Sequence, residues 1–214
     1  MSEPVHPLKL VSLLLQYPQG ELLEARAALC DAAAELGDGR QAQAIRAFTD
    51  WYAHMPAAEL QARYVDTFDF SRRSTLHLSY HTFGDRRQRG MALLALKQRY
   101  AAAGLEVDAS ELPDYLPLML EFATLAPEPG LEILARHREA IELVRSSLHA
   151  AGSPWAALLD AVTLPLPGLT RAQAARVRRL AEEGPPEEDV GLEPSAPPEV
   201  LPRAGSAPAA SEPR

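Results

Sequence analysis

Apolar residues recur at intervals of three and four positions along most of the chain, the spacing that gathers side chains on one face of an α-helix. Alanine, leucine, glutamate and arginine, all good helix formers, dominate these stretches. Prolines and glycines separate them, so we expect helices over 8–17, 21–36, 40–54, 57–68, 86–103, 112–125, 131–151, 154–162 and 171–183. The pattern predicts an all-α protein in which residues 1–183 form a single helical bundle.

One segment has a different hydrophobic period. Residues 75–81 (TLHLSYH) alternate between apolar and polar with period two, which is typical of a half-buried strand. No second strand-like run is evident in the sequence, and a lone strand would leave its backbone donors and acceptors unpaired. We therefore predict a helix here as well, with Leu76, Tyr80 and Phe83 on one face.

Residues 184–214 differ in composition from the rest of the chain. They hold 8 of the 19 prolines, and their six acidic residues outnumber their two arginines. Few large apolar side chains are present to offset the backbone entropy lost on ordering, about 1 to 2 kcal/mol per residue. We expect a disordered, acidic, proline-rich tail that follows the helical domain.

Charge and cysteine content narrow the possible functions. The chain has 21 basic and 29 acidic residues, a net charge of -8, which argues against a nucleic-acid partner. Cys30 is the only cysteine, so a disulfide within the chain is excluded and a thiolate-bound metal is not expected. The apolar run 10–15 is far shorter than the roughly 18 residues of a membrane span and lacks the flanks of a signal peptide. We expect a cytoplasmic protein that does not insert into a membrane.

A metal site is one candidate chemistry. His77, His81 and Asp85 would share a face of a continuous helix, which leaves a metal-dependent hydrolase as an alternative. However, Gly84 is expected to break such a helix, and Asp85 is placed to cap the next one at Arg86. We therefore predict no metal and no cofactor.

A second charged cluster also falls short of an active site. Asp66 and Asp69 stand beside Arg72 and Arg73, among aromatic residues. They would form either a local ion-pair network or the polar rim of a binding groove. No glycine-rich phosphate loop and no nucleophile with a base accompany them, so we expect no enzymatic activity. An acidic helical domain of this kind is more typical of proteins that bind a helix or a peptide.

Four stretches carry a family resemblance: 10–18 (LVSLLLQYP), 64–70 (YVDTFDF), 80–94 (YHTFGDRRQRGMALL) and 111–122 (ELPDYLPLMLEF). In order and spacing they closely resemble the NarJ family, the nitrate reductase molybdenum cofactor assembly chaperones, over about residues 8–165. The resemblance implies the all-helical fold of the TorD/DmsD group.

The same resemblance implies a task. Members bind the apo form of the catalytic (alpha) subunit of respiratory nitrate reductase at its N-terminal segment, assist insertion of the molybdenum cofactor, delay membrane docking, and are not enzymes. A client of the dimethyl sulfoxide or trimethylamine oxide reductase type is an alternative. Because surfaces that bind clients can also bind each other, the protein is expected to be a monomer or a weak homodimer.

The residues suggest how a client segment could bind. An amphipathic client helix would lay its apolar face in a groove and set its basic residues against carboxylates at the rim. The predicted floor comprises Tyr64, Phe68, Tyr80, Leu116 and Leu120, and the predicted rim comprises Asp66, Asp69, Asp85, Asp114 and Glu121. Leu116 and Leu120 are also compatible with the core. A weaker alternative has the cofactor pyrophosphate at a helix start beside Arg86, Arg87 and Arg89.

Overall fold

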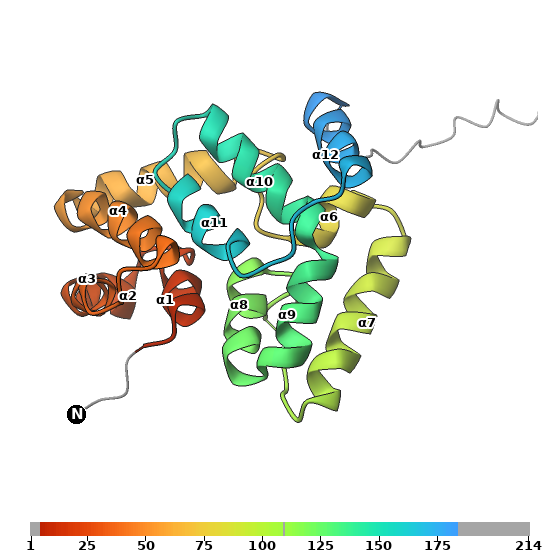
Figure 1. The fold of residues 1–214 in the computed structure, drawn as a ribbon, viewed down its shortest axis with the longest axis horizontal. Helices are drawn as coiled ribbons and strands as arrows, with labels where there is room; N and C mark the ends of the chain where they lie inside the picture. Colours follow the sequence, from red (N-terminus) through yellow and green to blue (C-terminus); the bar gives the residue numbers. More distant parts are fainter. Residues whose placement is uncertain (1–4, 109, 184–214) are drawn as a thin grey trace, which may run out of the picture.

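The computed structural model describes residues 5–108 and 110–183, and the predicted tail lies outside them (Figure 1). Within the described residues the chain forms twelve α-helices and no β-strand, which confirms the predicted all-α class. The helices are α1 (Pro7–Leu14), α2 (Gly20–Glu24), α3 (Arg26–Ala34), α4 (Arg40–His54), α5 (Ala57–Phe68), α6 (Leu78–Phe83), α7 (Gln88–Ala102), α8 (Leu116–Leu125), α9 (Pro127–Arg136), α10 (Arg138–Ala150), α11 (Ala156–Thr163) and α12 (Arg171–Glu183).

Helix α1 packs on α8 and α11, and also on α3 and α4 (Figure 1). Its apolar residues cover most of its circumference, and Leu10, Val11 and Leu15 are fully buried. Helix α11 in turn packs on α4 and on α10, so that it connects the first five helices to the α8–α10 region. One hydrophobic cluster runs through all of these elements, and Trp155 is its largest fully buried side chain.

Helices α8 and α9 form a tight antiparallel hairpin. A Cβ atom added at Gly130 would lie 2.3 Å from the Cα of Ala123, closer than any real contact. Glycine at this position therefore lets the two helix backbones touch. Pro127 begins α9, where its fixed φ suits the first helical position and its missing N–H costs nothing.

Two long helices predicted from periodicity are each broken in the structure. The stretch 21–36 divides at Ala25 into α2 and α3, and 131–151 divides at His137 into α9 and α10. At His137 the backbone leaves helical values (φ -96°, ψ 13°), and the imidazole Nδ1 lies 2.9 Å from the carbonyl oxygen of Ile133. The start of the helix predicted over 112–125 was also wrong, because α8 begins at Leu116.

The helix predicted for 75–83 exists only over Leu78–Phe83. Residues 75–77 are not helical, and His77, whose backbone is extended (φ -86°, ψ 94°), forms an isolated antiparallel bridge with Tyr115. The N–H of Leu116 donates to the carbonyl of Leu76 (2.9 Å), and that of Leu78 donates to Asp114 (3.0 Å). The predicted helix is therefore correct from Leu78 onward, whereas the residues before it are held by hydrogen bonds to a segment that the sequence pattern placed in a helix.

Candidate functional site

A cleft of about 260 Å³ opens where the end of α5 meets the bridge between His77 and Tyr115. We call it the tyrosine cleft; it is lined by Tyr17, Tyr64, Phe68, Asp69, Thr75, Leu76, His77, Glu111 and Tyr115. It continues into a shallower hollow along the connection from α1 to α2, which shares Tyr17, Glu111 and Tyr115 and adds Gln16, Gln19, Gly20, Glu21 and Leu22.

Aromatic rings form the floor of the tyrosine cleft. Tyr64 packs edge-on against Tyr17 and lies 4.7 Å, between ring centroids, from Phe68. Its hydroxyl donates to the carbonyl of Leu15 (2.9 Å) and lies 3.4 Å from the hydroxyl of Tyr115. These bonds tie the floor to the end of α1, so the rings hold fixed positions.

Burial raises the pKa of both Tyr64 and Tyr115, and the neighbouring carboxylates of Asp69 and Glu111 shift each pKa further in the same direction. Both phenols therefore stay protonated at neutral pH. These two residues offer ring faces to a ligand and carry no negative charge of their own.

The rim of the tyrosine cleft is acidic. Asp69, Glu111 and Glu21 are exposed around its mouth, and no lysine or arginine is among the residues that line either part. His77 is the one residue of the lining that can become a cation, and its Nδ1 faces the carboxylate of Asp114 at 3.3 Å. An aromatic floor with a negative rim favours a cationic, amphipathic ligand over an anion.

Asp114 lies behind the cleft rather than at its rim. Its carboxylate is fully buried and accepts hydrogen bonds from the backbone N–H of Ser79 (3.1 Å), the hydroxyl of Ser79 (2.5 Å) and the guanidinium of Arg89 (3.4 Å). Burial alone would raise the pKa of Asp114, but the hydrogen bonds from His77 and Ser79 and the charge of Arg89 outweigh it and hold that pKa below its usual value. Asp114 therefore joins the start of α6 to the 113–116 segment and positions the cleft wall.

The structure divides the other predicted site residues among separate places. Leu116 and Leu120 are fully buried in the core. Glu121 forms an ion pair with Lys9, between α8 and α1. Asp66 is exposed and lines a different cleft, on the other side of α5. Of the ten predicted residues, the tyrosine cleft brings together Tyr64, Phe68 and Asp69.

The region of Tyr80 and the start of α7 is organised by Arg89, whose guanidinium lies over the ring of Tyr80, 5.6 Å from its centroid. The prediction that Asp85 caps the next helix was wrong: α7 begins at Gln88, no side chain caps it, and Asp85 is exposed 4.0 Å from Arg89. Arg89 points inward to Asp114, so its charge is already engaged and does not face a pterin pyrophosphate. Arg87 is exposed.

The three residues of the alternative metal site do not converge. His77 precedes α6 in extended conformation, and Gly84, in the left-handed region (φ 58°), separates Asp85 from α6. His81 is buried with its Nε2 2.9 Å from the carbonyl of Thr75. In the described part of the chain, no three histidine, cysteine, aspartate or glutamate side chains are grouped to hold a metal ion.

Sequence reasoning missed Tyr17, Glu111 and Tyr115 as members of the site. All three stand inside the family-like stretches, but only the bridge to His77 brings Tyr115 and Glu111 to the end of α5.

Among the described residues, no helix has both the length and the apolar composition needed to cross a membrane.

Comparison with known proteins places this architecture. The family model described as nitrate reductase delta subunit matches residues 24–161. The probable nitrate reductase molybdenum cofactor assembly chaperone NarW of Escherichia coli is 35% identical over 156 residues, which are 72% of this chain and 65% of that relative. The chain thus spans just under two thirds of the length of NarW.

Two further relatives agree. The probable nitrate reductase molybdenum cofactor assembly chaperone NarJ of Bacillus subtilis is 35% identical over 153 residues, 70% of this chain and 82% of the relative. NarJ of Escherichia coli, a chaperone of the same description, is 32% identical over 156 residues, 72% of this chain and 66% of the relative. The matched family model covers more than half of the chain, and so the chain belongs to the nitrate reductase delta subunit family.

Proposed function

We propose that this protein is a chaperone for the assembly of a respiratory nitrate reductase. It binds the apo catalytic subunit in the cytoplasm before the molybdenum cofactor is inserted. The names of the relatives support the assembly role, since NarW and both NarJ proteins are described as nitrate reductase molybdenum cofactor assembly chaperones. The observation that carries the proposal is the tyrosine cleft, in which an aromatic floor stands beneath three carboxylates.

The client segment is an amphipathic stretch at the N-terminus of the catalytic subunit. Its apolar side chains contact the rings of Tyr17, Tyr64 and Tyr115, and its basic side chains pair with Asp69 and Glu111 at the rim. Rings held by packing and by hydrogen bonds lose little conformational freedom when a ligand binds, so little of the binding free energy is lost to ordering them. Acidic groups at the rim also accelerate encounter with a basic segment.

Binding of this kind performs the task without a chemical step. A client whose N-terminal segment is held by the chaperone is kept from docking onto its membrane-bound partner, and the release of that segment commits the loaded subunit to docking. The chaperone needs no catalytic residue and no cofactor of its own for this.

Calorimetry with a synthetic peptide of the client's N-terminus tests the proposal. The double variant Asp69→Asn, Glu111→Gln removes two rim charges, each worth about 0.2 to 1 kcal/mol, so the peptide should bind about two- to thirtyfold more weakly. Glu128→Gln is the matched control, because it removes an exposed carboxylate of α9 that lines neither part of the cleft. Equal affinities for the double variant and the control would contradict the assignment of the cleft.

A further inference from the structure

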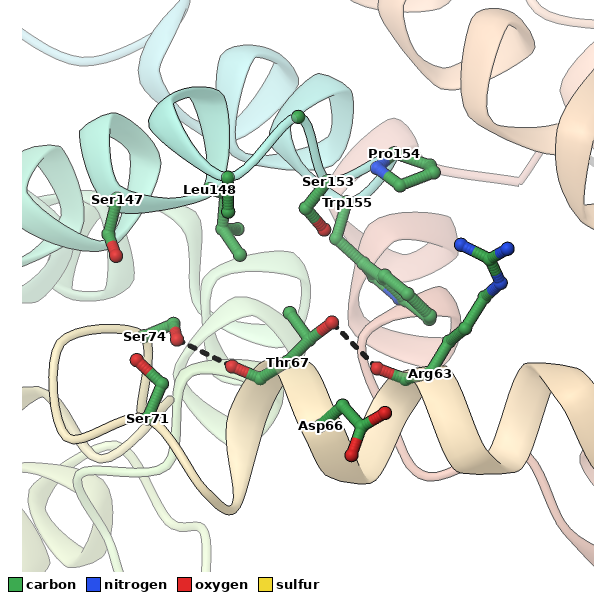
Figure 2. Close-up of a pocket in the computed structure, with 12 residues that line it drawn as sticks. Arg63, Asp66, Thr67, Ser71, Ser74, Ser147, Leu148, Ser153, Pro154 and Trp155 are labelled. Atoms are coloured by element: carbon green, nitrogen blue, oxygen red, sulfur yellow. Dashed lines mark hydrogen bonds between the residues drawn. The ribbon is translucent and has the colours of Figure 1, made fainter.

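A second cleft lies on the other side of α5 (Figure 2). It has a volume of about 280 Å³ between α5, the loop that follows it and the turn from α10 to α11. We call it the serine cleft; it is lined by Arg63, Asp66, Thr67, Ser71, Ser74, Ser147, Leu148, Ala151, Gly152, Ser153, Pro154 and Trp155. The tyrosine and serine clefts share a wall, because the rings of Tyr64 and Phe68 both pack edge-on against Trp155.

Unsatisfied hydrogen-bonding groups distinguish the serine cleft from the other hollows. The indole Nε1 of Trp155 and the hydroxyl of Ser153 are buried and have no hydrogen-bond partner within the described part of the protein, and Trp155 is only 2% exposed. Buried donors are nearly always paired in proteins, since an unpaired one costs free energy. Ser147 and Ser153 point from the α10–α11 side toward α5, across from Ser74 (Figure 2).

Several other polar groups of the lining already have partners. The hydroxyls of Thr67 and Ser74 donate to the carbonyls of Arg63 (2.6 Å) and Thr67, and Arg63 pairs with Glu59 at 2.9 Å. Asp66 forms no ion pair with any described residue and is exposed. The lining of the serine cleft therefore contains two buried donors without a partner, on Trp155 and Ser153, and one exposed carboxylate, on Asp66.

The two buried donors and the exposed carboxylate together favour a ligand that has both an acceptor oxygen and a positive charge. The buried donors require an acceptor oxygen, but an anionic acceptor would meet the charge of Asp66, and the guanidinium of Arg63 in the lining is already engaged. A neutral amide carbonyl avoids that repulsion. A positive charge on a flexible side chain of the same ligand would pair with Asp66. An arginine or lysine residue within an extended peptide carries both groups.

We propose that the serine cleft is a second peptide-binding site, which takes a basic residue of an extended polypeptide. The backbone carbonyl of that residue accepts from Trp155 and Ser153, and its cationic side chain pairs with Asp66. This inference rests on the proposed function in naming the client as the source of the segment. It assigns to Asp66 a binding role separate from that of Asp69, although both residues belong to the same stretch of sequence.

Nuclear magnetic resonance of the indole N–H groups in the full chain tests the proposal. The protein has two tryptophans, and a Trp51→Phe variant assigns the Trp155 signal. The probe is N-acetyl-arginine N-methylamide, and its matched control is the citrulline analogue, which keeps the shape and loses the charge. We expect a saturable downfield shift of the Trp155 proton with the arginine probe, and binding about fivefold weaker with citrulline.

Two variants separate this site from the tyrosine cleft. Asp66→Asn should weaken the arginine probe to the level of citrulline, whereas Asp69→Asn should leave the Trp155 shift unchanged. Equal binding of the two probes, or a Trp155 signal that does not respond at tens of millimolar probe, would overturn the proposal; the second result would leave water as the partner of Trp155. If the client peptide still binds in calorimetry and loses affinity with Asp69→Asn, the proposed function stands even when the serine cleft fails.

Discussion

Replacing Asp114 by asparagine tests the idea that a buried carboxylate builds the wall of the tyrosine cleft. The carboxylate is fully buried and accepts hydrogen bonds from Ser79 and Arg89. The substituted side chain would be neutral, and its amide could accept from only part of this set, so Arg89, with its side chain 19% exposed, would lose its buried anionic partner. Breaking one member of a buried charged pair costs about 3 to 5 kcal/mol, and the retained amide hydrogen bonds offset part of that. We expect a loss of about 2 to 4 kcal/mol in the free energy of unfolding.

Urea denaturation followed by far-ultraviolet circular dichroism measures this loss directly. The client peptide should also bind more weakly, because Asp114 fixes the bridge that holds Tyr115 and His77 in the cleft. An Asp108→Asn variant is a suitable control, since Asp108 is an exposed carboxylate that bonds only within its own turn. The reasoning fails if Asp114→Asn costs less than about 1 kcal/mol, or if peptide binding vanishes while stability is unchanged, which would make Asp114 a contact residue.

Three further outcomes follow from the packing and the pKa shifts. Gly130→Ala should destabilise the protein by about 1 to 3 kcal/mol in thermal unfolding, because its methyl group would overlap the backbone of Ala123, whereas Gly168→Ala, at an open position, should have little effect. Burial lowers the pKa of His81, so its contribution to stability is present above its unfolded pKa near 6.5 and is lost as pH falls toward the folded value; His81→Gln should flatten that part of a pH titration of stability, and an unchanged slope would contradict it. The depressed pKa of Asp114 likewise gives stability that is present above about pH 4 and is lost in stronger acid, a loss that Asp114→Asn should lack.

Much of the fold could be predicted from hydrophobic periodicity. The ranges expected for α4 and α5 match the structure, because Gly39 and Pro56 mark where these helices begin. The breaks at Ala25 and His137 could not be predicted, since neither position is marked by proline or glycine. The hydrophobic period runs across both breaks, so it gives no sign of them in the sequence.

In the 75–81 segment, the sequence pattern differs from that of a helix although most of the segment is helical. The helix predicted here exists from Leu78 onward, but the prediction was wrong for residues 75–77, where His77 pairs with Tyr115. The partner of this segment is only a bridge at Tyr115 with hydrogen bonds at Asp114 and Leu116, too short to produce a pattern of its own. The backbone N–H and C=O groups of a short non-helical segment can therefore be paired by a few hydrogen bonds to a segment that has no strand-like pattern in the sequence.

The candidate site was partly accessible to sequence reasoning. Tyr64, Phe68 and Asp69 lie within one turn and a half at the end of α5, and the family-like stretch pointed to them together. Tyr17 and Tyr115 come from stretches more than 40 residues away along the chain, and only the fold brings them beside these residues. Asp114 carries a charge in the sequence but is buried in the structure, a distinction that depends on Ser79 and Arg89 packing around it.

Complex formation with the apo catalytic subunit of nitrate reductase tests the central claim most directly. The full chain is mixed with the purified subunit, with and without its molybdenum cofactor, and the mass of the complex is measured by light scattering after size-exclusion chromatography. The account predicts a complex with the apo subunit that the Asp69→Asn, Glu111→Gln variant forms more weakly and that the loaded subunit does not form. Absence of any complex, or equal binding of apo and loaded subunits, would contradict it.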